Sequence, residues 1–222
     1  MNFSVCKGIL AALFLIVLAS GCATAPKSYD YTAFREAKPR SIVVLPPLNS
    51  SPDVKATYSM LAQMSYPLAE SGYYVLPVSL VDAAFKENGL SNAAEVHAVP
   101  TAKLREIFGA DAALYVEVKE YGSSYRIISS ETAVAAEARL VDLRTGQTLW
   151  TGSARSSSAE NNNNNNNGLA GMLIGALINQ IANSVSDKSH TYAGITSQRL
   201  LTAGGGQGRL LYGPRNAKYG QD

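Results

Sequence analysis

The chain has 222 residues, with 19 Lys and Arg against 17 Asp and Glu and a formal net charge of +2. This near balance, with basic residues that never cluster beyond pairs, argues against a nucleic-acid partner. Both cysteines lie within the first 22 residues, so the rest of the chain has no thiol for a disulfide or a thiolate metal site. We expect one domain stabilised by its hydrophobic core alone.

The amino-terminal segment is typical of a cleavable secretory signal over residues 1–21. Lys7 precedes an unbroken apolar run from Ile9 to Leu18, and this run is too short to span a bilayer, which needs about 20 apolar residues. The sequence Ala19-Ser20-Gly21-Cys22 then resembles a bacterial lipobox, which implies acylation of Cys22, although alanine stands where a lipobox most often has leucine. The alternative is an ordinary signal peptide with a chance cysteine.

The residue after the cysteine is Ala23 and not aspartate, which favours the outer membrane by resemblance to enterobacterial sorting. Two or more acyl chains would hold the protein stably in a membrane. Residues 22–39 are expected to form a lipidated tether, because they are mostly small and polar. Residues 40–203 are predicted to form a single periplasmic α/β domain, with surface display as the alternative orientation.

The first half of this domain alternates between strands and helices. A β-branched run at 41–45 predicts a buried strand. Asp53 is predicted to cap a helix that ends at Gly72, with an apolar face made of Val54, Tyr58, Leu61, Ser65 and Leu68. A second strand is predicted at 73–78. Two helices follow, one beginning with a capping-box pattern at Ser79 and one at 101–108.

After Gly109 the hydrophobic period changes to two. The alternation from Leu114 to Val118 predicts a half-buried strand, and residues 125–128 and 132–143 continue as antiparallel strands. A turn at 144–147 should lead into a further strand at 148–152. The order predicts an α/β fold: a mixed sheet with a β-α-β-α-α start, an antiparallel β-meander and C-terminal helices.

The last third of the chain has three different compositions. Residues 153–168 include seven consecutive asparagines and are predicted to form a disordered loop. The segment 168–185 is strongly hydrophobic, and residues 190–201 can form a last amphipathic helix. The glycine-rich tail at 204–222 is expected to be extended or flexible.

The segment 168–185 has two interpretations. One is a core helix packed on the sheet. The other is an interface with a second copy, a companion lipoprotein or the membrane surface, because small and apolar residues continue around more than one helical face. Polar residues in its second half argue against a membrane-spanning role. The candidate interface residues are Gly171, Leu173, Gly175 and Leu177.

Two stretches resemble a known group of periplasmic lipoproteins: residues 108–118, with a Gly-Ala-Asp turn into a strand, and residues 138–150, with the pattern L-V-D-x-x-T-G-x-x-x-W. The group includes the curli secretion-channel subunit, the lipoprotein activator of penicillin-binding proteins and the TolB amino-terminal domain. The lipobox, the asparagine-rich loop and Arg209 to Arg215 are most similar to a family of uncharacterised Gram-negative outer-membrane lipoproteins, known partly as vaccine-candidate antigens. The resemblance implies a TolB-like α/β sandwich and an outer-membrane address, but no reaction.

No set of titratable residues marks an active site. His97 and His190 are the only histidines; packing or surface roles are expected for them, and no metal site or cofactor is predicted. Asp142 is interpreted as a turn-orienting carboxylate, and Glu117, Lys119 and Glu120 as a solvated strand face.

We therefore expect a non-enzymatic lipoprotein that acts by protein contacts in envelope assembly or export, as a homo-oligomer or with companion lipoproteins. Two alternatives stay open: a subunit of a secretion-channel-like complex, and a module that binds a peptide or a cell-wall fragment.

Overall fold

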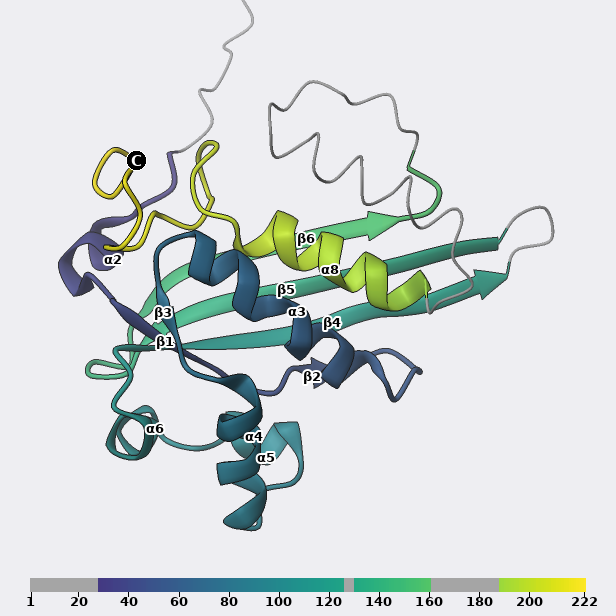
Figure 1. Cartoon of the computed structure of the whole chain (residues 1–222), viewed down its shortest axis with the longest axis horizontal. Helices are drawn as coiled ribbons and strands as arrows, with labels where there is room; N and C mark the ends of the chain where they lie inside the picture. Colours follow the sequence, from purple (N-terminus) through teal and green to yellow (C-terminus); the bar gives the residue numbers. More distant parts are fainter. Residues whose placement is uncertain (1–27, 126–129, 161–187) are drawn as a thin grey trace, which may run out of the picture.

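A six-stranded mixed sheet organises the chain, in a computed structural model that describes residues 28–125, 130–160 and 188–222. In chain order the elements are α2 (Thr32–Ala37), β1 (Ser41–Val44), β2 (Leu48–Asn49), α3 (Ala56–Glu70), β3 (Tyr74–Val75), α4 (Val78–Glu87), α5 (Ala93–His97), α6 (Thr101–Phe108), β4 (Ala112–Tyr125), β5 (Ser130–Asp142), β6 (Thr148–Ser157) and α8 (Lys188–Leu201). The strands lie in the order β3-β1-β4-β5-β6, with β2 also beside β4 (Figure 1). Parallel pairs join β1 to β3 and β4, and β2 to β4, whereas β4, β5 and β6 are antiparallel. The predicted mixed α/β sheet and its meander are confirmed.

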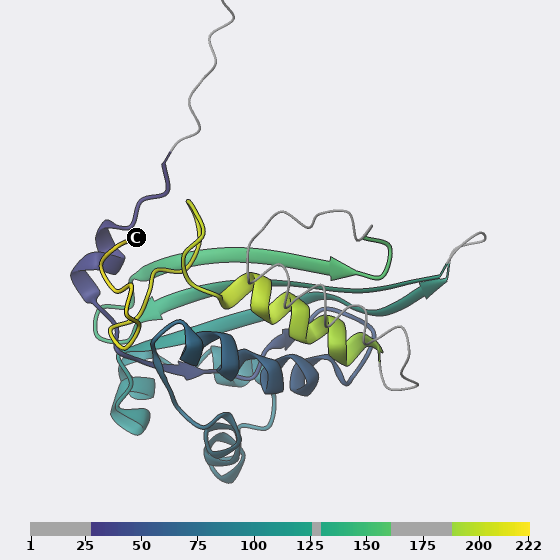
Figure 2. The ribbon, with the colours of Figure 1, turned by 45° about the horizontal axis from the view of Figure 1, so that its top comes forward.

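Side chains of β4 alternate between two hydrophobic clusters on opposite faces of the sheet. Leu114 and Val116 join the larger cluster, which is covered by α3 and α8; these two helices run beside each other along the sheet (Figure 2). Ala113 and Tyr115 join the smaller cluster, which is covered by α4, α5 and α6. β1 contributes to both clusters, which explains its unbroken β-branched run.

The predicted apolar face of α3 was partly wrong. The helix begins at Ala56, so Val54 lies before it and is 86% exposed, and Tyr58 is 47% exposed. Tyr58 instead contacts α4, where the ammonium of Lys86 lies 4.8 Å from its ring centroid. The buried face is Ala56, Met60, Leu61, Met64, Pro67 and Leu68. The predicted face was obtained by alternating steps of four and three residues from Val54, and these steps miss both Met60 and Met64.

The domain begins earlier than the predicted boundary at residue 40. Residues 32–37 form α2, and Phe34 is only 4% exposed. Tyr29 and Tyr31 pack against the core as well, with their ring centroids 4.6 Å apart. The described part of the expected tether is therefore folded, because its three aromatic side chains cover one end of the sheet.

The predicted loop at 153–168 was wrong for its first residues, since β6 continues through Ser157. The polar side chains of this strand are satisfied by α8: the hydroxyl of Ser156 donates to the carbonyl of Tyr192 at 2.9 Å and contacts the hydroxyl of Thr196 at 2.7 Å. Serines that suggest a loop in isolation thus form a strand beside a helix that offers them partners.

The tail at 204–222 lies against α2 and the end of α3, and it buries Leu210 and Leu211. Two backbone bonds tie it to the turn after α3: Gly213 N donates to Ser71 O at 2.8 Å, and Arg215 N donates to Gly72 O at 3.1 Å. The backbones approach so closely that a Cβ on Gly72 would lie 2.5 Å from the amide nitrogen of Asn216.

The signal, Cys22 and residues 161–187, including the predicted interface segment, lie outside the described residues. Within the described ranges, no helix is both long and apolar enough to cross a membrane.

Replacement of Gly72 by alanine should destabilise the protein more than replacement of Gly89. Both residues have positive φ, +97° and +81°, so both variants carry the cost of a left-handed backbone, about 1 kcal/mol. Only Gly72→Ala adds a clash with the tail, which should raise the total to about 3 kcal/mol. Urea unfolding of both variants measures the difference; equal losses would show that the tail contact is loose.

Candidate functional site

One half of a sheet face is open to solvent and forms a groove of about 550 Å³. The helices α4, α5 and α6 cover the beginning of β4 on this face, and beyond Tyr115 the strand side chains meet water. Strands β2, β4, β5 and β6 form the floor, and α5 contributes one wall through His97. The lining residues are Leu48, His97, Tyr115, Val116, Glu117, Glu137, Ala138, Arg139, Thr151, Gly152 and Ser153.

Tyr115, a buried residue in the lining of this groove, contacts both a cation and a histidine. The guanidinium carbon of Arg139 lies 4.0 Å from the centroid of the Tyr115 ring. The ring of His97 meets the same tyrosine edge-on, with centroids 5.2 Å apart. The pairing of Tyr115 with Arg139 across β4 and β5 produces the stacked geometry. A cation stacked on a tyrosine ring is restrained and partly desolvated.

His97 is neutral in this setting. Its Nε2 lies 3.0 Å from the carbonyl oxygen of Pro46, and a carbonyl only accepts, so Nε2 carries the proton. Burial lowers the pKa of His97, and the positive charge of Arg139 adds to this, while the bond to Pro46 opposes it. The neutral ring leaves Nδ1 as an acceptor.

The acidic side chains of the groove are paired. Glu117 accepts from Lys119 at 2.8 Å and from the hydroxyl of Ser50 at 2.7 Å. These two hydrogen bonds lower the pKa of Glu117. Lys119 also lies 3.5 Å from Glu137. One lysine thus contacts both carboxylates on the floor of the groove, and these three groups together carry one net negative charge.

Arg139, in contrast, forms no ion pair with any residue in the described ranges. It is exposed and stacked, and the hydroxyl-bearing Thr151 and Ser153 lie nearby in the same lining. A guanidinium restrained in this way can bind a carboxylate through two parallel hydrogen bonds. Within the same ranges, no three His, Cys, Asp or Glu residues gather as metal ligands. The guanidinium of Arg139 is therefore chemically suited to an anionic group.

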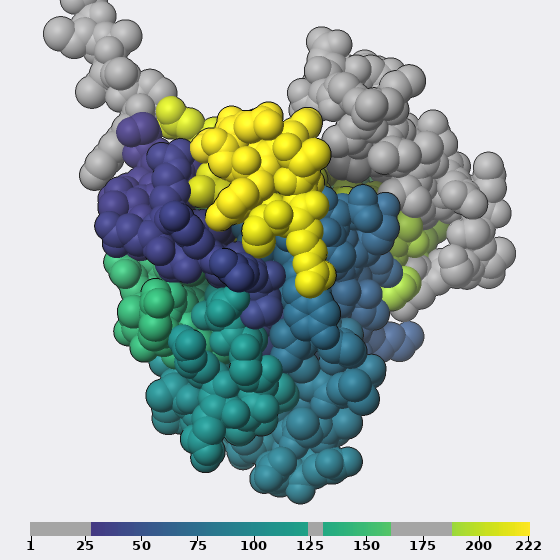
Figure 3. Space-filling view, turned by 60° about the vertical axis from the view of Figure 1, so that its left-hand side comes forward, coloured from purple at the N-terminus to yellow at the C-terminus, as the bar shows by residue number. Residues whose placement is uncertain are grey.

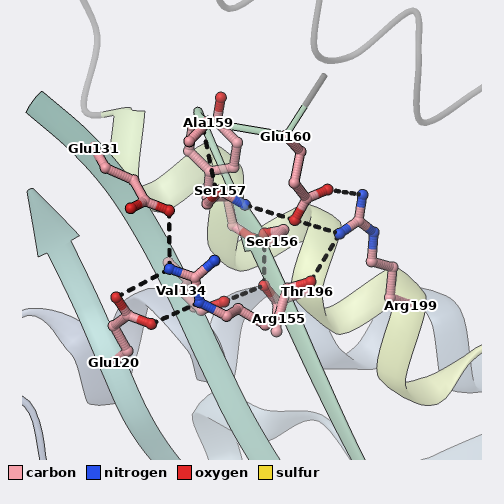
Figure 4. A network of polar contacts seen from close by, with 11 residues as sticks. Glu120, Glu131, Val134, Arg155, Ser156, Ser157, Ala159, Glu160, Thr196 and Arg199 are labelled. Carbon is pink, nitrogen blue, oxygen red and sulfur yellow. Dashed lines mark hydrogen bonds and ion pairs between the residues drawn. The ribbon is translucent and has the colours of Figure 1, made fainter. Parts of the chain in front are cut away.

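The outer edge of β6 is occupied by side chains at both ends. Near its beginning, Thr151 N donates to the hydroxyl of Tyr29 at 2.8 Å. Near its end, Arg199 donates to the carbonyl of Arg155 at 2.7 Å, and Ser157 N donates to Glu160 at 3.0 Å (Figure 4). A further strand cannot pair along the whole edge without displacing these groups, so the open face is the more accessible contact surface.

The sequence analysis named some residues of this groove but did not predict a site there. Glu117, Lys119 and Glu120 do lie on a solvated strand face, but Glu120 pairs with Arg155 at 2.8 Å outside the groove lining. Asp142 orients its turn as predicted, since it accepts from the backbone N–H groups of Arg144 and Thr145. Arg139 was missed, although the alternation of β5 could have placed it opposite Tyr115.

His190 has a different environment from His97. Its Nδ1 lies 2.8 Å from the hydroxyl of Ser59 and its Nε2 lies 2.7 Å from the amide of Gln63, both on α3. The hydroxyl of Tyr121 donates to Ser59 at 2.7 Å. These contacts join α3, α8 and β4 on the covered face, so the two histidines lie on opposite faces of the sheet, and His190 is not part of the groove.

Fold and site together define an α/β domain with an exposed groove on a mixed sheet. The chain belongs to the GNA1162-like family, described as "Putative lipoprotein GNA1162-like", whose profile matches residues 29–215. The "Putative lipoprotein NMB1124/NMB1162" of Neisseria meningitidis serogroup B is 49% identical over 211 residues, which cover 94% of this chain and 96% of that protein. The family resemblance predicted from the sequence is thereby confirmed.

A solved structure of a relative agrees with this assignment. The crystal structure of lipoprotein GNA1162 from Neisseria meningitidis matches with a TM-score of 0.52 and 55% sequence identity. The match covers 66% of this chain and 100% of that one. A PelC dodecamer from Paraburkholderia phytofirmans is 10% identical with a TM-score of 0.45, covering 81% of this chain and 93% of that one.

A pH dependence should follow from His97. Because its folded pKa is lowered, the unfolded chain binds a proton at a pH where the folded protein does not. His97 therefore contributes its full stabilisation of the fold above its ordinary pKa of about 6.5. This stabilisation is lost as the pH falls from that value toward the lowered pKa of the folded protein. When the pH is lowered from about 7.5 to about 5.5, the free energy of unfolding should fall by up to about 1 kcal/mol more for wild type than for His97→Gln.

Urea unfolding at both pH values measures this difference. The lowered pKa of Glu117 places its titration below this window. Parallel losses in wild type and variant would show that His97 does not control the effect.

Proposed function

We propose that the protein is an acyl-anchored lipoprotein of the outer membrane and that its domain acts by binding a carboxylate-bearing segment of a partner protein in the groove around Arg139. The lipobox at Cys22 and the lipoprotein family support the anchor. The residue after the cysteine, Ala23, supports the outer membrane. The process that this contact serves is envelope assembly or export, without a reaction at the groove.

The observation that carries the binding role is the unpaired guanidinium of Arg139 on the ring of Tyr115. The carboxylates on the same floor, Glu117 and Glu137, both form ion pairs with Lys119 and none with Arg139. A ligand carboxylate at Arg139 thus gains a charge-assisted hydrogen bond without displacing an existing ion pair. The partner is either a second copy of this chain or a companion lipoprotein.

The anchor is tested by Cys22→Ser. Wild type should incorporate labelled palmitate and fractionate with the outer membrane, because two or more acyl chains give stable attachment. The variant should lose the label and the outer-membrane location. Labelled variant protein, or unlabelled wild type, would contradict acylation at this residue.

The groove is tested with a photoreactive benzoylphenylalanine at Ser153, an exposed position in the lining. In living cells it should form one defined adduct, with itself or with one envelope protein. Arg139→Gln should weaken that adduct about tenfold or more, because a hydrogen bond to a charged group contributes about 1.5–3 kcal/mol.

The same photoreactive residue at Leu80, which is 67% exposed on α4, is the matched control and should not form this adduct. An adduct at Ser153 that is unchanged by Arg139→Gln would contradict recognition of a carboxylate.

A second candidate function is binding of a short peptide or cell-wall fragment, which the groove volume of about 550 Å³ favours. Saturable binding of carboxylate-bearing peptides to the purified protein, abolished by Arg139→Gln, would distinguish it from a contact between large surfaces.

A further inference from the structure

A second pocket, of about 350 Å³, lies between α2 and the carboxyl-terminal tail. Figure 3 shows the tail and the amino-terminal segment together at one end of the molecule. The walls combine aromatic rings with two cations: the lining residues are Phe34, Arg35, Lys38, Pro39, Tyr73, Leu211, Tyr212, Tyr219, Gly220 and Asp222. Tyrosines beside Arg and Lys are the combination that proteins use at the membrane–water interface.

The polar groups of the walls, which include the carboxylate of Asp222, use only part of the hydrogen-bonding capacity of the two cations. The hydroxyl of Tyr73 donates to the carbonyl of Leu211 at 2.6 Å, which turns it away from a ligand. The carboxylate of Asp222 accepts from Tyr212 N at 2.6 Å. Arg35 donates one Nη2 hydrogen bond to the main-chain oxygen of Asp222, the last residue in the sequence, at 2.9 Å. This bond leaves further N–H groups of its guanidinium for another acceptor.

Lys38 has an unusual backbone for a lysine. It ends α2 with φ +46°, and among the described residues it is the only one besides glycines with positive φ. Glycine is the usual residue at such a helix end, because a Cβ is unfavourable in this conformation. The ammonium of Lys38 is exposed and makes no hydrogen bond or ion pair with the described residues. A strained residue with an unpartnered charge on a pocket points to a ligand.

The position of the pocket limits what it can face. Five residues, 23–27, separate Cys22 from Ser28 at the start of the described domain. A fully extended chain of this length spans about 20 Å. The pocket lies on the first helix after this segment, so acylation at Cys22 would hold it close to the lipid headgroups.

We propose that this pocket binds the headgroup of an anionic phospholipid in the membrane that holds the anchor, with Arg35 and Lys38 at the phosphate and Tyr219 at the interface. The inference rests on the proposed acylation of Cys22. Its consequence is a fixed orientation: the α2 end faces the bilayer, instead of the domain rotating on its tether.

The test uses the full-length acylated protein in vesicles of phosphatidylethanolamine with or without phosphatidylglycerol. A photoreactive benzoylphenylalanine replaces Tyr219, which is 44% exposed, and intact-mass analysis counts phospholipid adducts. We expect an adduct that increases with phosphatidylglycerol. Lys38→Gly should lower its yield about fivefold, because one basic residue near an anionic surface has about that effect.

Lys38→Gly separates binding from folding, since glycine suits φ +46° and should leave the thermal midpoint unchanged or higher. The photoreactive residue at Leu80, on the distant α4, is the control and should give no lipid adduct. Equal yields at both positions, or equal yields with and without phosphatidylglycerol, would overturn the inference. The same mass measurement shows whether the protein is acylated; an unacylated protein would mean that the proposed anchor is wrong, which is a different failure.

Discussion

The groove exists because β4 and β5 are longer than the helices that cover one of their faces. These strands have 14 and 13 residues. On one face, α3 and α8 have 15 and 14 residues and run side by side along the strands (Figure 2). Each is about half as long as β4, because a helix rises about 1.5 Å per residue and a strand about 3.3 Å. On the other face, α4, α5 and α6 have 10, 5 and 8 residues and cover the beginning of β4. Strand alternation then forces every second side chain of the uncovered half into water, so this half is charged.

Charge pairing on the uncovered half decides which residue remains for a ligand. Lys119 forms ion pairs with Glu117 and Glu137, and Arg155 forms ion pairs with Glu120 and Glu131. Such exposed pairs contribute little to stability. For the proposed binding their effect is larger, because among the described residues they leave the guanidinium of Arg139 without a counterion in the groove. The ring of Tyr115 holds it in place.

The two ends of the described chain form one structure at the opposite side of the core from the β4–β5 hairpin (Figure 1). The hydroxyl of Tyr31 donates to the carbonyl of Arg209 at 2.5 Å, and the indole N–H of Trp150 donates to the carbonyl of Gly208 at 2.9 Å. The tail therefore covers the largest side chain of the core. This packing places the second pocket, between α2 and the tail, next to the first residues of the folded domain.

The sequence by itself determined the mixed α/β fold, the strand at β1, the helix at α6 and the turn at Asp142, because each has a strong local signal: a β-branched run, a glycine stop or a turn carboxylate. It could not determine that Phe34 is buried, that Ser156 lies in a strand or that Arg139 stacks on Tyr115. Each of these depends on residues at least 20 positions away, in the tail, in α8 or across a strand pair. Local periodicity contains no information on such partners, so only the tertiary structure decided where the groove and the pocket lie.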